Sequence, residues 1–455
     1  MKQNNSPWLT QLQLDREVKK LEHDATADVV IVGGGIAGVT TLYYLLKHTN
    51  KQIILLEGNK IAHGATGHNA GQVVAEFERP LASLVAEHGM HRAVDGYRMM
   101  ESAWDLLDGI FDDTGIDIPF REFIGYGGYC ELEQLLVDLE TELIKSNHGL
   151  VSFPVLVSRE SGWFARIPEP YRKLCTEVDA RTIDELLGIK PNGYHAALPE
   201  KKATTNSALF SETLAVWCLE NYPDRAQVFE HTFVQGIGLG DEVRLITDRA
   251  TVRTAEAVLC TNGFENFYIK DKNGYAIDTE FHHLVEGSVG YMTGYLSHRE
   301  LDPMANRYYE NGKVRSADTF LSDPYFYVTR RKFGGDDDPT HLMAIGGPEV
   351  HLEDREIYFR DFDVHERFRD DAVAFAAKHF DHMDQFDQKF FWHGLMGYTR
   401  TGVRVVGREP IDSRLMYNLG CNGVGILPSI MGARKIARHV AGEPVPDTIF
   451  DPKKA

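Results

Sequence analysis

Three glycines near the start of the chain are spaced to bring backbone close to a phosphate. Gly33, Gly35 and Gly38 form the pattern G-x-G-x-x-G directly after the apolar run Val29–Val32. The first glycine of such a pattern permits a tight turn, the second lets backbone approach a pyrophosphate, and the third lets a helix pack closely on the strand. The N-terminus of that helix would offer N–H groups and a positive dipole end to the phosphates.

The residues around these glycines supply the elements that such a site needs. The run 29–32 is typical of a strand buried on both faces, and the apolar spacing over 36–46 is typical of a helix. A second apolar run, 53–56, ends at Glu57, whose carboxylate is placed to accept hydrogen bonds from a ribose diol. Strand, glycine turn, helix, strand and acid together predict a dinucleotide site over 28–57.

Two later stretches also favour contact with a ligand. The loop IAHGATGHNAGQVV, residues 61–74, is rich in small residues and lacks acidic side chains, which suits backbone that runs against a flat ligand better than a flexible surface loop. Near the other end, a short strand over 417–419 leads through the glycine-rich turn 420–425 into a helix over 427–440. This second strand, turn and helix predicts another helix N-terminus that faces an electron-rich group.

Composition narrows the class of protein. The 455 residues predict two domains, and 43% hydrophobic with 25% charged residues is typical of a globular protein. The net charge of −19 argues against nucleic acid or an anionic membrane as the main partner; it favours cationic substrates such as amines, or simply solubility. No 18-residue apolar run occurs, so no membrane span is expected. Five scattered cysteines without a C-x-x-C pair indicate reduced thiols in a cytoplasm.

Further elements follow from local patterns. Alternation over 228–264 predicts half-buried antiparallel strands, with a more buried strand at 258–260. The other expected elements are helices over 88–113, 133–146 and 364–379, strands over 125–132, 281–296, 325–331 and 342–347, and a loop from 198 that contains Asn206 and precedes a helix reaching 219.

These elements predict an α/β protein with a discontinuous Rossmann-like domain. The glycine motifs and their bordering strands fall in three blocks, 27–90, 195–270 and 390–445, which must meet around one ligand. We expect 91–194 and 271–389 to form a substrate domain on an antiparallel sheet, 1–26 to form an N-terminal arm, and 446–455 a C-terminal tail.

The motifs in this order resemble the D-amino-acid-oxidase-like flavoprotein superfamily, which includes glycine and sarcosine oxidases, dimethylglycine-type dehydrogenases and gamma-glutamylputrescine oxidoreductases. The resemblance runs from about 28 to 442 and is carried by VVIVGGGIAG with ILLE, GATGHNAGQVV, TFVQGI with AEAVLCTNGF, and WHGLMGYTRTGVRVVGREP leading to NLGCNGVGI. It implies FAD as the cofactor, and the second glycine turn agrees, because a nicotinamide enzyme does not need one.

The resemblance also implies which residues contact FAD, and no metal site is expected. The expected cofactor-binding residues are Gly33, Gly35, Ile36, Ala37, Gly38, Glu57, Gly58, Ala65, Thr66, His68, Asn69, Ala70, Gly71, Gln72, Val73, Val234, Thr261, Asn262, Gly263, Gly394, Gly420, Asn422, Gly423, Val424, Gly425 and Ile426.

Two departures from the family bear on cofactor attachment and substrate. His68 matches the histidine that holds the flavin covalently in dimethylglycine-type dehydrogenases, whereas the flavin-linking cysteine of monomeric sarcosine oxidases would fall near Gly394. We therefore expect non-covalent FAD, with attachment through His68 as the alternative. Many amino-acid oxidases of this group read G-L-R-P, whose arginine binds the substrate carboxylate, but here Met396 takes that place. A thioether cannot make the bidentate pair that a carboxylate favours.

The expected reaction is oxidation of an amine or N-substituted amino acid, in which a hydride moves from the carbon beside nitrogen to flavin N5 and gives an imine that hydrolyses. O2 or an electron carrier would be the acceptor. Besides Met396, the candidate substrate residues are His393, Tyr398 and Arg330, each of which could equally pack in the core or lie on the surface. Arg330 or Arg400 could also restore a carboxylate clamp.

Several alternatives remain open at this point. A D-amino-acid or glycine-type oxidase or dehydrogenase with a relocated clamp, a flavoprotein subunit with structural FAD, a flavin hydroxylase or halogenase, and a nicotinamide dehydrogenase share the N-terminal pattern. A hydroxylase would want a G-D-A-A-H-like motif in the last third, which the sequence lacks. The particular amine, the acceptor and the oligomeric state are left open by the sequence.

Overall fold

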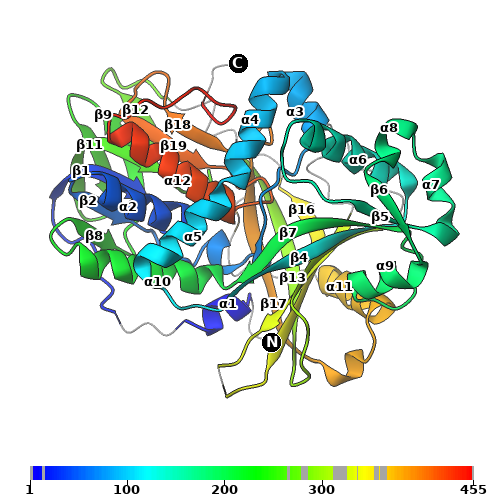
Figure 1. Cartoon of the computed structure of the whole chain (residues 1–455). Helices are drawn as coiled ribbons and strands as arrows, with labels where there is room; N and C mark the ends of the chain where they lie inside the picture. Colours follow the sequence, from blue (N-terminus) through cyan, green and yellow to red (C-terminus); the bar gives the residue numbers. More distant parts are fainter. Residues whose placement is uncertain are drawn as a thin grey trace.

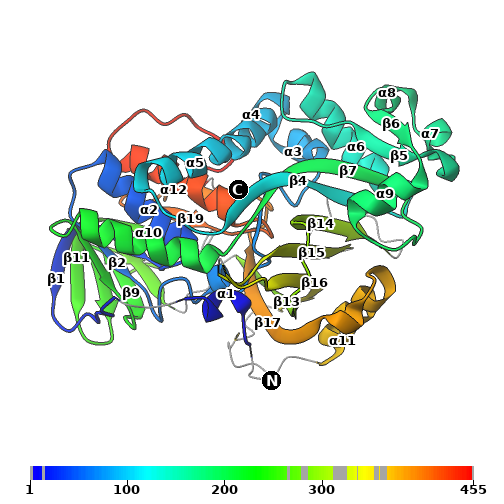
Figure 2. The same cartoon turned by 60° about the horizontal axis from the view of Figure 1, so that its bottom comes forward.

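The computed structural model describes residues 4–12, 16–263, 267–277, 285–310, 325–335, 337–352, 358 and 366–452. Within these ranges the chain forms two large β-sheets that lie side by side, and helices pack against both (Figures 1 and 2). The strand expected from Phe281 and the helix expected from Val364 begin outside the described residues.

The first sheet contains the parallel strands that the apolar runs predict. β1 (Ala25–Val32) lies between β2 (Ile53–Leu56) and β11 (Thr251–Leu259), parallel to both. β8 (Ala226–Phe229) continues this parallel series beside β2, and β19 (Leu415–Leu419) continues it beside β11. Alternate residues of β1 and β2 enter two separate hydrophobic cores. Both faces are therefore buried, as uninterrupted apolar runs predict.

Antiparallel strands extend the same sheet beyond β11. β9 (Val234–Leu239) and β10 (Val243–Thr247) pair antiparallel with each other, and β10 pairs antiparallel with β11. The prediction was wrong for β8, because this strand pairs parallel with β2 rather than with its neighbour in sequence. β12 (Tyr268–Asp271) and β18 (Val405–Arg408) complete the sheet.

The second sheet is mainly antiparallel and has the order β17-β13-β16-β15-β14-β4-β7-β5-β6. Two pairs, β14 with β4 and β5 with β6, are parallel. Its strands are β3 (Gln72–Val73), which pairs with β7, β4 (Phe120–Tyr129), β5 (Val155–Ser158), β6 (Cys175–Val178), β7 (Ala196–Thr205), β13 (Glu286–Ser297), β14 (Met304–Tyr309), β15 (Tyr325–Lys332), β16 (His341–His351) and β17 (Asp387–Tyr398).

The blocks expected to build the cofactor domain contribute strands to both sheets. β7 from the block 195–270 and β17 from the block 390–445 lie in the second sheet, whereas the other strands of these blocks lie in the first. The second sheet therefore approaches the glycine motifs directly, through strands that are continuous in sequence with them.

Two long helices pack side by side on one face of the first sheet. α2 (Ile36–His48) and α12 (Ile426–Val440) pack against each other, and α10 (Ser207–Asn221) packs on α2 (Figure 1). The remaining α-helices are α1 (Pro7–Thr10), α3 (Leu81–His88), α4 (Met90–Glu101), α5 (Ala103–Thr114), α6 (Leu132–Asn147), α7 (Trp163–Arg166), α8 (Glu169–Arg172), α9 (Ala180–Leu187) and α11 (Glu366–His379).

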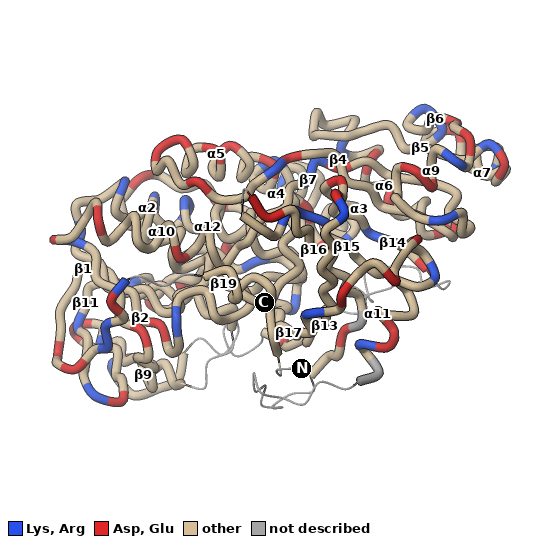
Figure 3. Tube along the Cα trace, turned by 90° about the horizontal axis from the view of Figure 1, so that it is seen from below, with Lys and Arg blue, Asp and Glu red and all other residues tan. Residues whose placement is uncertain are grey.

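Acidic and basic residues are interspersed over both halves of the molecule (Figure 3). None of the helices in the described ranges combines the length and the apolar character that crossing a membrane requires.

Two local predictions differ from the structure for identifiable reasons. The helix expected over 88–113 is two helices, α4 and α5, separated at Ser102, whose hydroxyl donates to the Met99 carbonyl and competes with the helical backbone bonds. The loop expected from 198 is the strand β7. Its charged run hides the strand pattern, yet the Lys202 ammonium is buried in an ion pair 3.0 Å from the Glu200 carboxylate.

Part of the N-terminal arm is buried in the core. Trp8 of α1 has no exposed surface, and its ring lies edge-on to Trp392 with 6.2 Å between centroids. The Trp8 indole N–H donates to the Asn69 carbonyl at 2.6 Å. Segment 4–12 thus fastens the loop 61–74 to strand β17.

We predict that Trp8→Ala strongly destabilises the protein. Truncating a fully buried tryptophan should lower the free energy of unfolding by about 3–5 kcal/mol, because the cavity left behind is only partly refilled. Denaturant-induced unfolding followed by circular dichroism measures the change. Trp8→Phe, which keeps most of the packing and loses the N–H donor, should cost about 1 kcal/mol beyond its smaller volume change. Equal stability of Trp8→Ala and the wild type would contradict this assignment.

Candidate active site

The glycine turn after β1 leaves no room for side chains. Gly33 has a φ of 105°, and a Cβ at this position would lie 2.7 Å from the Cys260 carbonyl oxygen. A Cβ at Gly38 would lie 1.8 Å from the Gly33 carbonyl oxygen. Only glycine fits either place, so α2 packs directly against the end of β1 and directs its N-terminus into the space beyond the strand.

Glu57 is fixed at the end of β2 by backbone donors. Its carboxylate accepts hydrogen bonds from the Gly34 and Asn59 amides, each at 2.7 Å. The same side chain lines a cavity together with Gly58. Held in this way, the carboxylate ties the glycine turn to the second strand and presents an acceptor at the position where a ribose would lie.

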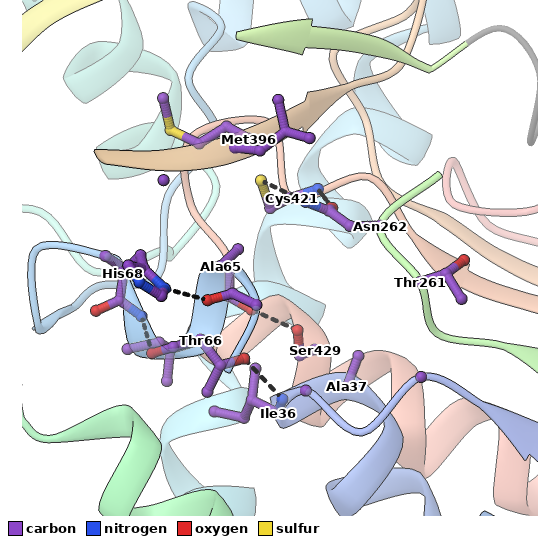
Figure 4. A pocket seen from close by; sticks show the side chains of 18 of the residues that line it. Ile36, Ala37, Ala65, Thr66, His68, Thr261, Asn262, Met396, Cys421 and Ser429 are labelled. Atoms are coloured by element: carbon purple, nitrogen blue, oxygen red, sulfur yellow. Dashed lines mark hydrogen bonds between the residues drawn. The ribbon is translucent and has the colours of Figure 1, made fainter. Parts of the chain in front are cut away.

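The loop 61–74 is held by its own polar side chains and by α1. The Ile36 amide, at the start of α2, donates to the Thr66 hydroxyl at 2.9 Å, and Figure 4 shows this bond beside His68. His68 Nδ1 lies 2.9 Å from the Gly64 carbonyl oxygen. The Asn69 amide group donates to the Ser207 hydroxyl at 2.7 Å. The small residues therefore form a rigid wall rather than a flexible surface loop.

The second glycine turn, between β19 and α12, is fixed by two asparagines. Asn262, just after β11, accepts a hydrogen bond from the Cys421 amide at 2.8 Å (Figure 4). Asn422 accepts one from the Thr399 amide at 2.8 Å, just after β17. The N-terminus of α12 is thereby anchored to both sheets and, through Gly423 and Val424, reaches the same cavity as α2.

One cavity of about 600 Å³ joins these parts. It extends from the β1 turn and Glu57 past the loop 61–74 to the N-terminus of α12 and the second sheet. The predicted cofactor residues in its wall are Gly33, Gly35, Ile36, Ala37, Glu57, Gly58, Ala65, Thr66, His68, Asn69, Ala70, Gln72, Val234, Thr261, Asn262, Gly394, Gly423, Val424, Gly425 and Ile426.

The other predicted cofactor residues lie behind this wall. Gly71 and Gly420 adopt positive φ angles of 70° and 81°, and they shape the turns rather than face the cavity. The residues outside the lining are Gly38, Gly71, Val73, Gly263, Gly420 and Asn422.

Some of the candidate substrate residues line the cavity, and others lie outside its lining. Met396 and Tyr398 line the cavity, on strand β17. His393 is buried and lies outside the lining, with Nδ1 2.6 Å from the Tyr358 hydroxyl. The Arg330 guanidinium packs over the Phe380 ring, 4.9 Å from its centroid, and Arg400 is exposed in a turn. Neither arginine is placed to bind a substrate in this cavity.

The sequence patterns missed the polar residues that the second sheet contributes. Arg307 of β14 lines the cavity, and its guanidinium pairs with the Glu76 carboxylate at 3.0 Å and with Glu200. The Tyr325 hydroxyl donates to both oxygens of Glu78, at 3.1 and 3.2 Å. Tyr327 and Glu349 also lie in the wall. The sequence did contain one signal for these polar residues: Glu76 and Glu78 lie two residues apart, shortly after the GQVV motif.

These buried charged groups shift one another's pKa values. Burial raises the pKa of the Glu76 carboxyl to about 7, although Arg307 acts in the opposite direction. Burial also acts to raise the pKa of Glu200, but Arg307 and Lys202 outweigh it and hold that pKa below its usual range. Glu200 is therefore the permanent anion of the cluster, and Glu76 is the carboxylate that titrates near neutrality.

The cavity fits FAD by its backbone as well as its shape. Two helix N-termini and a glycine turn that a Cβ would fill suit a pyrophosphate and an electron-rich ring, and Glu57 suits a ribose. Beyond this cradle the cavity continues to the carboxylates and tyrosines of the second sheet. Fold and site together are those of a dinucleotide-binding protein whose cofactor cradle is continuous with a second, polar part of the same cavity.

The chain belongs to the FAD dependent oxidoreductase (DAO) family, whose model matches residues 28–439. It is 33% identical to gamma-glutamylputrescine oxidoreductase of Escherichia coli over 101 residues, which are 22% of this chain and 24% of that protein. It is 27% identical to human mitochondrial dimethylglycine dehydrogenase over 122 residues, 25% of this chain and 14% of that protein. The aligned stretches cover 14% to 28% of the lengths of the curated relatives.

Solved structures share the fold over nearly the whole chain. Glycine oxidase from Geobacillus kaustophilus superposes with a TM-score of 0.66 at 17% identity, covering 95% of this chain and 99% of that one. L-proline dehydrogenase from P. horikoshii superposes with a TM-score of 0.64 at 14% identity, covering 92% and 95%. The family identifies the chain as an FAD-dependent oxidoreductase.

We predict that Glu57→Ala weakens FAD binding without unfolding the protein. The loss of charge-assisted hydrogen bonds should cost about 1.5–3 kcal/mol, equivalent to a roughly 10- to 150-fold higher dissociation constant for FAD. Fluorescence of released FAD measures this constant. Glu160→Ala is the matched control, because Glu160 also accepts a backbone hydrogen bond, from Ala180, but lies outside the cavity. An unchanged constant in Glu57→Ala would refute the ribose assignment.

Proposed function

We propose that this protein oxidises the C–N bond of an amine or N-substituted amine to an imine, which water hydrolyses to a carbonyl compound and an amine. The observation that carries the proposal is the charge of the substrate compartment. Its described wall contains Glu76, Glu78 and Glu349 together with Met396, at the place where related amino-acid oxidases have a clamping arginine.

The arginines in the described wall are already engaged. Arg307 pairs with Glu76 and Glu200. Arg404 donates to the Asn418 side-chain and main-chain oxygens, at 2.7 and 3.0 Å. A substrate carboxylate would therefore enter a compartment that already holds excess negative charge, and burying it without a cation costs several kcal/mol (~3–5). An ammonium or neutral amine meets no such penalty.

FAD supplies the hydride acceptor when it is bound. The chain's part is to orient and to stabilise. The α12 N-terminus, at Gly423 to Ile426, directs backbone N–H groups into the cavity, where they favour developing negative charge. Met396, Met292 and Tyr327 supply uncharged surface that holds the carbon beside nitrogen and excludes water.

Other features of the proposal concern compartment and acceptor. All five cysteines are free thiols, which supports a reducing compartment such as the cytoplasm. The electrons would pass on to O2 or to an electron carrier.

A second candidate function, oxidation of amino acids with Arg307 as a relocated clamp, requires Arg307 to leave Glu76 or Glu200 when substrate binds.

We predict that FAD is bound non-covalently. His68 lines the cavity, with Nδ1 directed at the Gly64 carbonyl, and this hydrogen bond can hold the ring without any covalent link to the cofactor. Acid precipitation of the purified protein should leave the flavin in solution, and the mass of the polypeptide should match the sequence. A polypeptide heavier by one FAD, with the extra mass lost in His68→Ala, would establish the covalent alternative.

We predict that decarboxylated substrates reduce the flavin faster than their α-carboxylate counterparts. Anaerobic mixing with benzylamine and phenylglycine, and with putrescine and ornithine, followed by flavin absorbance, makes the comparison. At least a tenfold preference for the amine is expected. Met396→Arg should reduce that preference by supplying the missing cation, whereas Met396→Leu should retain it. Reduction by the α-carboxylate members alone would overturn the amine proposal and favour the relocated clamp.

A further inference from the structure

A second cavity lies directly behind the substrate compartment. Its volume is about 420 Å³, and it is bounded by α4, α6 and β7. Three residues, Val74, Glu76 and Arg307, belong to the walls of both cavities. The second cavity reaches the surface at Arg98 and Val151, which are exposed. The three shared residues form the partition between the two cavities, and the second cavity connects this partition to bulk water.

Glu76 is the acid in this partition. It lies in the segment between β3 and α3, and 12% of its side chain is accessible. Both carboxylate oxygens face the Arg307 guanidinium, at 3.0 and 3.1 Å from the same nitrogen. A contact to one nitrogen leaves the carboxylate able to approach a ligand in the substrate compartment on one side and water on the other.

The groups around Glu76 keep the pKa of its carboxyl at about 7. The charged groups that face it are Arg307 of β14, Glu200 and Lys202 of β7, and Glu78 of its own segment. Tyr97 of α4 is the neighbouring phenol; burial raises the pKa of this phenol well above its usual value, and Glu76 adds to the effect. Tyr97 therefore stays neutral, and Glu76 is the group that exchanges a proton.

We propose that the Glu76 carboxylate accepts the proton that a substrate ammonium must lose before oxidation, and passes it to water in the second cavity. The proposal rests on the proposed amine function, because an ammonium nitrogen has no lone pair to assist hydride loss. In the first step the N–H bond breaks, the nitrogen keeps the electron pair, and a carboxyl O–H bond forms. In the second step, which follows oxidation of the neutral amine, that proton moves to water, and the carboxylate is restored; with an amine that cannot be oxidised, the proton stays on Glu76.

The test measures binding rather than turnover. The probe is the α,α-dimethyl counterpart of the amine that reduces the flavin fastest, since it has no C–H beside nitrogen and cannot be oxidised. Titration calorimetry of the holoenzyme from pH 5.5 to 9, in two buffers of different ionisation enthalpy, gives the affinity and the number of protons released.

Wild-type protein should bind the probe with pH-independent affinity, and without proton release, between about pH 7 and the pKa of the amine. Below that range Glu76 is already protonated, so affinity should fall about tenfold per pH unit as one proton is released on binding. Glu76→Gln should lose this plateau. It should release one proton and lose about tenfold in affinity per unit throughout the range below the amine pKa.

Glu200→Gln is the matched variant, which removes a carboxylate from the same arginine but not from the substrate compartment. Its loss removes a negative charge that raises the pKa of Glu76 and leaves Arg307 to Glu76 alone. Both effects lower the pKa of Glu76, so the lower end of the plateau should move to lower pH. This shift tests the proposal even where Glu76→Gln does not fold.

The outcomes separate the two proposals. Failure of the probe and of all amines to bind wild-type protein would overturn the amine function and this inference with it. Amine binding with the same plateau and proton count in Glu76→Gln as in wild type would overturn only the role of Glu76. A plateau that is lost in Glu78→Gln but retained in Glu76→Gln would assign the proton to the other carboxylate and equally contradict the proposal.

Discussion

The close packing of α2 and α12 on one face of the first sheet is the constraint on which the cavity depends. Each helix follows a strand through a glycine turn, and each directs its N-terminus to the same space. The approach is possible only because Gly38 lies against the Gly33 carbonyl and Gly432 of α12 lies against Asn418 of β19, where a Cβ would be 2.2 Å from the side-chain oxygen. The N-termini of two helices that begin at Ile36 and Ile426 thereby border one cavity.

The second sheet and the segments beside it contribute a buried cluster of charges. Arg307 and Lys202 are nearly inaccessible to solvent and are compensated by Glu76 and Glu200. Such a buried cluster contributes little net stability, but removal of one member leaves an uncompensated charge. We propose that its value lies in selection of the ligand. We propose that a compartment whose cations are already paired disfavours an anionic substrate; Glu76, whose pKa burial raises to about 7, lies where the two cavities meet.

Sequence patterns predicted the residues that line the cavity around the two glycine turns far better than those that the second sheet contributes. The strand, turn and helix around Gly33 form a local signal, because each residue acts through its neighbours in sequence, and the same holds at Gly423. The part of the cavity beside the second sheet contains Arg307 of β14 and Glu349 of β16, which the pairing of both strands with β15 brings together, and Glu76, which lies between β3 and α3. Strand β7 was missed because its charged run Glu200-Lys201-Lys202 is typical of an exposed loop, whereas Lys202 is buried in an ion pair with Glu200. Arg330 shows the converse, since it has the right chemistry but faces Phe380 instead of the cavity.

The central claim is that one cavity places a flavin between two helix N-termini and opens to a carboxylate-lined amine compartment. A crystal structure of the purified holoenzyme soaked with the α,α-dimethyl amine probe tests it most directly. The account predicts the adenosine ribose at Glu57, the flavin ring against Gly423 to Ile426, and the probe nitrogen within hydrogen-bonding distance of Glu76. A flavin whose ring points away from α12, or a probe nitrogen bound on the side of Arg404 instead of Glu76, would contradict the account.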